Sequence, residues 1–293
     1  MTGTSIKERS SNNKKIVSSL DKDLCETVSA DKDLNHTKKP ELISANKQSS
    51  LPTEKILQQL TREDHYDKDF SDINILSAAR KGEIKTIERL IKDNIDVNMQ
   101  DKEGKSPLMV ATLNKNKELA GLLLKAHANV NSKDTNGKTA LRVAIENNAE
   151  DIALMLIKYN ADVNTKDKYK QTPLIWAAKN GRASWIKLLL KYSADINIED
   201  SHKKIAFIWA AMNGHKEIVK LLVNKVNINF KDIFGKNALI YSAIQGHTEI
   251  IKLLIKNKSF IHSTDCYGKT AAMYAKEHGH KEITLLLNRP LMR

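Results

Sequence analysis

The chain repeats a short pattern at a nearly constant interval, and this periodicity limits the folds open to it more than any other feature. An aspartate opens each unit, and the successive spacings are 33, 33, 33, 32 and 33 residues, at Asp101, Asp134, Asp167, Asp200, Asp232 and Asp265. A unit of this size cannot bury a core alone, so each unit has to pack against its neighbours. The spacing therefore predicts a stack of modules rather than one globular core.

The same residue types recur in the same order within each unit. An Asp-containing turn is followed by a T-P-L segment, a pair of alanines, a second turn, a leucine-rich row and an A-D-V-N segment, as residues 167–199 illustrate. This order resembles the ankyrin repeat over roughly residues 70–293. The resemblance implies an all-α solenoid of about seven stacked helix-turn-helix units with short β-hairpin loops. It also implies a non-catalytic scaffold that holds other macromolecules.

The pattern also predicts the domain boundaries. We expect an ankyrin-repeat domain over residues 61–293, with units near 70–100, 101–133, 134–166, 167–199, 200–231, 232–264 and 265–293. Residues 1–60 are polar and have no sustained apolar period, so we expect a disordered leader there. A short helix is possible at 54–60, where three apolar residues share one face. The leader is a spacer, or else a targeting or docking tail.

Two kinds of polar residue are expected to shape the repeats. Side chains that can accept a backbone N–H should begin the first helices, at Ser106, Thr139, Thr172, Asn237 and Thr270. Asparagines that follow the second helices should link adjacent turns through their amides, at Asn98, Asn131, Asn164, Asn197 and Asn229.

The unit at 200–231 departs most from this pattern. Lys203 replaces the glycine of the hairpin, Ile205 replaces the capping threonine, and one residue is missing near Lys225–Val226. Loss of a helix cap alone destabilises by roughly 0.5–2 kcal/mol. We therefore expect the stack to be least stable between residues 199 and 232.

Aromatic residues are expected on the face opposite to the leucine rows. Trp176 lies two residues after the buried Leu174, about 200° round the helix. It begins a set that we call the aromatic ladder: Trp176, Trp209, Tyr241 and Tyr274. The hairpin tips on the same side carry Tyr169, His202, Phe234 and Tyr267. Because Tyr and Trp are favoured binding anchors, we predict that these eight residues bind a partner protein. The alternative interpretation is that the ladder only packs between the hairpins and the first helices.

The charge of the chain admits two explanations. A formal net charge of +13 attracts acidic partner surfaces at low salt. Heavy use of Lys, Asn and Ile is also what an AT-rich genome produces. A basic nucleic-acid-binding scaffold is the rival function, but the lysines mostly mark the second helices, and the sequence has no helix-turn-helix, RRM or zinc-finger motif. We therefore expect a protein partner rather than nucleic acid.

Motifs for catalysis and targeting are missing from the sequence. It has no P-loop, G-x-S-x-G or H-E-x-x-H pattern, so we expect no enzymatic activity, cofactor or metal site. The N-terminus lacks a secretory h-region, no apolar run can cross a bilayer, and two cysteines make no disulfide framework. We expect a monomeric cytoplasmic protein. The alternative is an effector that a bacterium inside host cells exports, without a classical signal peptide, to engage host proteins.

Overall fold

Helix pairs follow one another along the chain in the computed structural model, which describes residues 74–288. The seven pairs are α3 (Ile75–Lys81) with α4 (Ile84–Lys92), α5 (Pro107–Leu113) with α6 (Lys117–Lys125), α7 (Ala140–Glu146) with α8 (Glu150–Lys158), α9 (Pro173–Lys179) with α10 (Ala183–Lys191), α11 (Ala206–Met212) with α12 (Lys216–Leu222), α13 (Ala238–Ile244) with α14 (Thr248–Lys256), and α15 (Ala271–Glu277) with α16 (Lys281–Asn288). This confirms the all-α solenoid of about seven units. The predicted leader at 1–60 and its helix at 54–60 lie outside the described residues.

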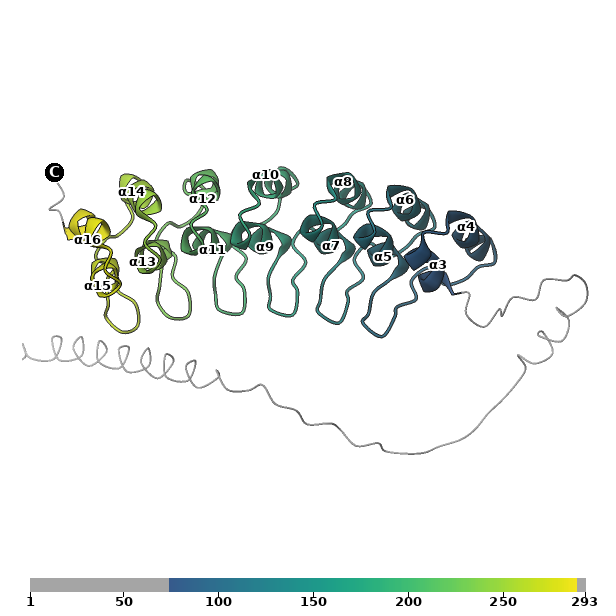
Figure 1. Cartoon of the computed structure of the whole chain (residues 1–293), viewed down its shortest axis with the longest axis horizontal. Coiled ribbons are helices and arrows are strands. Elements are labelled where there is room, and N and C mark those ends of the chain that lie inside the picture. The colour runs from purple at the N-terminus through teal and green to yellow at the C-terminus, as the bar shows by residue number, and fades with distance from the viewer. Residues whose placement is uncertain (1–73, 289–293) are drawn as a thin grey trace, which may run out of the picture.

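The helices form two rows, and the loops between repeats project to one side (Figure 1). The first helix of each pair lies beside the loops, and the second helix lies farther from them. No strand occurs between residues 74 and 288, where the only β-type pairing is an isolated antiparallel bridge between Thr264 and Thr270. The expected hairpins are therefore tight turns without strands, held by the bonds described below.

One continuous apolar core runs through the stack, between neighbouring repeats. The same leucine position of the second helices is at most 2% exposed in six repeats, at Leu123, Leu156, Leu189, Leu222, Leu254 and Leu287. Alanines of the first helices, such as Ala144, Ala177 and Ala210, are completely buried and let neighbouring helices approach closely. Each repeat thus buries its apolar side only by packing against the next one.

All five predicted side-chain caps of the first helices are confirmed. In each case the cap side chain accepts the backbone N–H of the residue three positions later, at 3.0–3.4 Å; the caps are Ser106, Thr139, Thr172, Asn237 and Thr270. Pro107 and Pro173 occupy the first helical position, where no N–H is required. Ile205 provides no side-chain cap to α11, as the sequence predicts.

The predicted asparagine links join all but one of the expected pairs of turns. Asn98, Asn131, Asn164 and Asn229 accept backbone N–H groups of the next repeat, from Asn129, Asp162, Asp195 and Phe260, at 2.7–2.9 Å. Asn197 makes no such bond within the part of the chain that the structure describes. The missing residue explains this, because α12 has seven residues where α10 and α14 have nine. The links are therefore interrupted in the repeat at 200–231.

Candidate partner-binding surface

Each hairpin is closed by the aspartate that opens its repeat. Oδ1 of Asp101 accepts the N–H groups of Glu103 and Lys105, each at 2.9 Å, and the Asp101 N–H donates to the Lys105 carbonyl at 3.1 Å. The same two carboxylate contacts recur at Asp134, Asp167, Asp200, Asp232 and Asp265. Burial alone would raise the pKa of Asp101, but these N–H groups and the Arg80 guanidinium hold it below its ordinary value. Charge-assisted bonds of this kind fix the shape of every tip.

Neighbouring hairpins are joined edge to edge by single backbone hydrogen bonds. The donors and acceptors are Thr135 to Glu103, Lys168 to Asn136, Ser201 to Tyr169, Ile233 to His202, and Cys266 to Phe234, at 2.9–3.2 Å. Neighbouring hairpins lie so close together that a side chain would not fit at Gly137. A Cβ added there, where φ is +75°, would lie 2.9 Å from the Lys168 nitrogen. The tips therefore form one continuous edge along the stack.

The other oxygen of the hairpin aspartate holds three of the four residues of the aromatic ladder. Trp209 Nε1–H donates to Asp200 Oδ2 at 2.8 Å, while the hydroxyls of Tyr241 and Tyr274 donate to Asp232 Oδ2 and Asp265 Oδ2 at 2.6 Å. Burial, and then the neighbouring aspartate, raise the pKa of both tyrosines, so their hydroxyls stay protonated and remain donors.

These contacts place the aromatic ladder between the first helices and the hairpins. Trp176, Trp209 and Tyr241 are half-buried, and Tyr274 is only 8% exposed. Trp176 packs against Arg142, whose guanidinium carbon lies 5.1 Å from the ring centroid. The rings therefore pack against the hairpins, and three of them keep part of their surface exposed.

Buried cations between the hairpins are a feature that sequence reasoning missed. The side chain of Lys204 is 8% exposed; its Nζ lies 3.1 Å from Asp232 Oδ2 and 5.3–5.6 Å from the ring centroids of Trp209, Phe234 and Tyr241. Such a cation gains from both the carboxylate and the ring faces. The available signal was a lysine four residues after the opening aspartate, which recurs at Lys105, Lys138, Lys204, Lys236 and Lys269.

Arg142 is a second buried cation that was missed. Its side chain is 6% exposed and lies 2.9 Å from Glu146 and 3.6 Å from Asp167, while Nη1 has no hydrogen-bond partner in the described region. Burial lowers the pKa of this guanidinium, and the two carboxylates oppose that shift. Arg142 therefore ties the first helix of its repeat to the next hairpin.

The four predicted tip residues differ in accessibility. Tyr169 and Tyr267 are 55% and 56% exposed, and His202 is exposed as well. Phe234 is half-buried because its ring lies against Lys204. The structure thus brings Trp209, Phe234 and Tyr241 together around one lysine and leaves the tyrosine tips in solvent.

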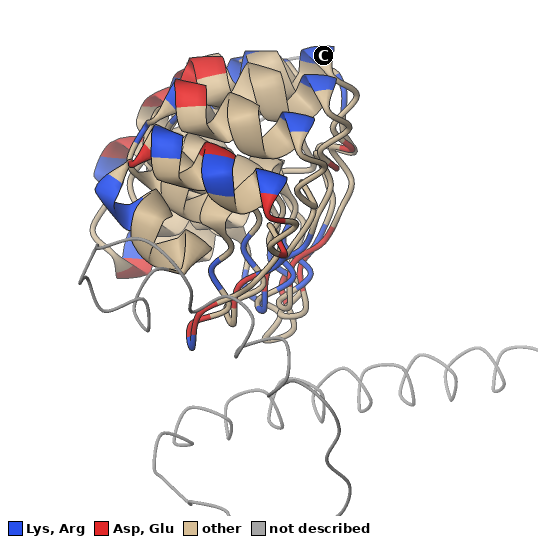
Figure 2. Cartoon of the chain, turned by 90° about the vertical axis from the view of Figure 1, so that its right-hand side faces the viewer, with Lys and Arg blue, Asp and Glu red and all other residues tan. Residues whose placement is uncertain are grey.

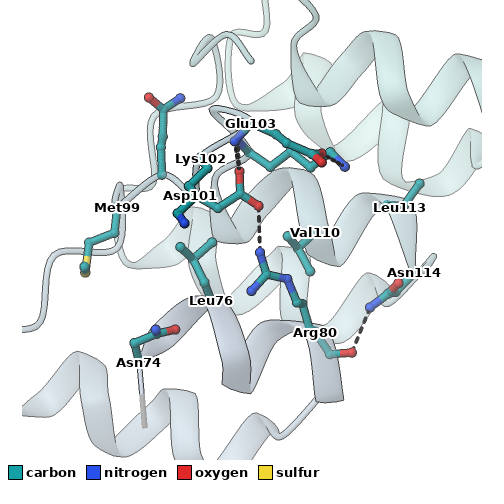
Figure 3. Close-up of a pocket in the computed structure, with 12 residues that line it drawn as sticks. Asn74, Leu76, Arg80, Met99, Asp101, Lys102, Glu103, Val110, Leu113 and Asn114 are labelled. Atoms are coloured by element: carbon teal, nitrogen blue, oxygen red, sulfur yellow. Dashed lines mark hydrogen bonds and ion pairs between the residues drawn. The ribbon is translucent and has the colours of Figure 1, made fainter. Parts of the chain in front are cut away.

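A cavity lies at the N-terminal end of the row, where the ladder position is Val110. It has a volume of about 720 Å³, and its walls include Leu76, Met99 and Leu113 (Figure 3). Arg80 and Asp101 form an ion pair of 2.7 Å at its centre. Val110, which lines this cavity, stands at the position that Trp or Tyr occupies in the last four repeats.

Histidines of the last three repeats lock neighbouring turns together. Nε2 of His215, His247 and His280 lies 3.1–3.2 Å from the carbonyl oxygens of Lys179, Met212 and Ile244 in the preceding repeats. Between residues 74 and 288, no group of three or more His, Cys, Asp and Glu side chains is arranged to hold a metal ion. In the same region, every helix is too short or too polar to span a membrane.

Comparison with known families agrees with this geometry. Residues 75–167, 135–200, 165–232 and 207–290 match the family described as Ankyrin repeats (3 copies). These overlapping matches run from α3 to α16 and so include more than half of the chain. No curated protein matches the sequence.

Proposed function

The chain belongs to the ankyrin-repeat family, and from this premise we propose that it is a non-catalytic scaffold that binds a partner protein through its hairpin tips and the adjoining face of the first helices. Ankyrin repeats generally mediate protein–protein interactions. The proposal concerns which surface of this chain makes the contact and which residues take part.

The exposed tyrosines at the tips are the observation that supports the proposal best. Tyr169 and Tyr267 keep more than half of their surface in solvent, although the hairpins beneath them are fixed by aspartate and backbone hydrogen bonds. A large aromatic side chain on a rigid loop loses little conformational entropy when a partner covers it. This combination favours binding over internal packing.

The eight predicted residues then divide into three roles. Tyr169, His202, Phe234 and Tyr267 contact the partner from the tips. The partly exposed side chains of Trp176, Trp209 and Tyr241 form the floor below them. Tyr274 is too buried for direct contact and serves to hold the last hairpin through Asp265.

Site-specific photo-crosslinking in the cells that make the protein tests this proposal. A benzophenone amino acid replaces Tyr169 or Tyr267 at the tips, or Lys187 or Lys220 on the outer helices as controls. We expect covalent protein adducts from the tip positions and none from the controls. Adducts that form equally from both sets, or only with nucleic acid, would contradict the proposal.

A further inference from the structure

In the hairpins of the fourth and fifth repeats, the aspartate side chains are buried and most of the lysines are exposed. The acidic residues there, Asp167 and Asp200, turn inward: the Asp167 side chain is 7% exposed and Asp200 is 4% exposed. Oδ1 of each accepts two backbone N–H groups, and Oδ2 faces Arg142 or Trp209. These carboxylates therefore contribute little negative charge to the surface.

Three lysines of the same two hairpins turn outward, whereas Lys204 is buried against Asp232. Lys168, Lys170 and Lys203 are exposed, and none forms an ion pair with a carboxylate among residues 74–288. Other hairpin lysines are neutralised, namely Lys105 by Glu103 at 2.6 Å, Lys138 by Glu146 at 2.8 Å, and Lys269 by Glu277 at 2.8 Å.

The unneutralised lysines lie beside two exposed rings. The five residues that we call the tip patch are Lys168, Tyr169, Lys170, His202 and Lys203. The two tips that carry them are joined by the hydrogen bond from Ser201 N–H to the Tyr169 carbonyl, 3.0 Å long. The tip patch is therefore one surface that spans two repeats.

Two of these lysines occupy a strained backbone conformation. Lys170 and Lys203 have φ of +57° and +55°, whereas four other hairpins have glycine at this position, at Gly104, Gly137, Gly235 and Gly268. A side chain other than glycine is disfavoured in the left-handed region. In both hairpins this position carries an exposed cation, which places two positive charges on adjacent tips.

We propose that the tip patch docks an extended, acidic segment of the partner protein. The inference rests on the proposed function and specifies the chemistry of the partner. Adjacent helix pairs are about 8–10 Å apart, a distance that about three residues of extended chain cover. Carboxylates three residues apart can therefore pair with Lys170 and Lys203 in turn, while the segment packs on Tyr169. Charge complementarity of this kind raises the association rate and fixes the register of the segment.

The limited extent of positive charge favours a peptide over nucleic acid. The hairpins on either side, at 134–138 and 232–236, each carry one aspartate and one lysine and so have no net charge. Seen along the stack, the helices farthest from the loops carry acidic and basic residues together (Figure 2). A duplex presents a phosphate about every 1.7 Å and needs a longer basic surface to neutralise it.

Fluorescence anisotropy with the full chain tests the inference. The probe is a fluorescein-labelled (Glu-Ser-Gly)₄ peptide, compared with its Gln-for-Glu version and with a single-stranded oligothymidine of twelve nucleotides. We expect the Glu peptide to bind at least tenfold more tightly than the Gln peptide. K170G/K203G should weaken binding of the Glu peptide at least tenfold, with a Tm equal to or above that of the wild type. The control K187Q/K256Q removes the same charge from the outer helices and should change the affinity less than twofold.

Three outcomes would overturn the inference. Equal losses of affinity in the two double variants would show that net charge alone attracts the peptide. Tighter binding of the oligonucleotide than of the Glu peptide would indicate a nucleic-acid partner. Unchanged binding of the Glu peptide by K170G/K203G would show that the tip patch is not the binding site. The crosslinking experiment separates this failure from failure of the proposed function. If the benzophenone at position 169 still captures a protein in the K170G/K203G background, the scaffold function stands and only the acidic segment is rejected.

Discussion

At the residue scale, the aspartate that opens a hairpin uses its two oxygens for different tasks in five of the six hairpins. Oδ1 of Asp232 closes the turn by accepting from Phe234 and Lys236, and Oδ2 accepts from Tyr241 and pairs with Lys204 of the preceding hairpin. The position of a tip therefore depends on its own first helix and on the repeat before it. The binding proposal requires rigid hairpin tips, and the bonds made by both aspartate oxygens provide that rigidity.

Replacing Tyr241 by Phe tests the support that the aromatic ladder gives. The change removes the 2.6 Å bond to Asp232 and leaves that buried carboxylate with fewer donors. Hydrogen bonds to charged groups contribute about 1.5–3 kcal/mol, so Y241F should lower the free energy of unfolding by about that amount in urea titrations. The control is Y169F at an exposed tip, which should change it by less than about 0.5 kcal/mol. Equal effects of the two variants would refute the supporting role.

Stability measurements can also detect the strain at Lys170 and Lys203. The left-handed conformation disfavours a residue other than glycine by about 1–2 kcal/mol, and the flexibility of glycine in the unfolded chain offsets part of that gain. K170G and K203G should each raise the free energy of unfolding by about 0.5–1 kcal/mol. The converse variant G137A should be destabilised, because its Cβ would lie 2.9 Å from the Lys168 nitrogen. A loss of stability in K170G would show that the lysine serves the fold.

At the element scale, the repeat at 200–231 is the weak point of the stack. Its first helix, α11, lacks a side-chain cap, α12 is two residues shorter than α10 and α14, and the asparagine link from Asn197 is absent in the described region. Stability in a repeat protein is roughly the sum of each repeat's own stability and the contacts with its neighbours. Local defects should therefore appear as local opening.

Native-state hydrogen exchange should reveal this weakness. Backbone amides of α12 are expected to exchange faster than those of α10 and α14, although all three helices lie inside the stack. The comparison is internal to one sample, so the overall stability of the chain does not affect it. Uniform protection across the three helices would reject the prediction made for residues 199–232.

Features that repeat at a fixed offset could be predicted from the sequence. The period, the caps at Thr172 and Asn237 and the asparagine links depend only on residue type and position within a unit. The bonds of the aromatic ladder could not be predicted, because periodicity places Trp209 on a face but does not show that its N–H reaches Asp200. The pairing of Lys204 with Asp232 was missed for a related reason, since it depends on how two hairpins lie together in space.

At the scale of the whole molecule, the stack uses its two sides differently. Apolar rows between successive repeats hold it together, and the edge of hairpin tips remains free for other contacts (Figure 1). The net charge of +13 is a poor guide to the partner, because much of the charge at the hairpins is buried or paired. Under our proposal, the few exposed tip residues set what a partner meets.

The central claim is that the hairpin tips bind the partner. Hydrogen-exchange mass spectrometry tests it most directly, by comparing the free chain with the chain bound to the partner that crosslinking identifies. Our account predicts slower exchange in the hairpins at 167–172 and 200–205 on binding, with no change in α10, α12 or α14. Protection of those second helices, with the two hairpins unaffected, would contradict it.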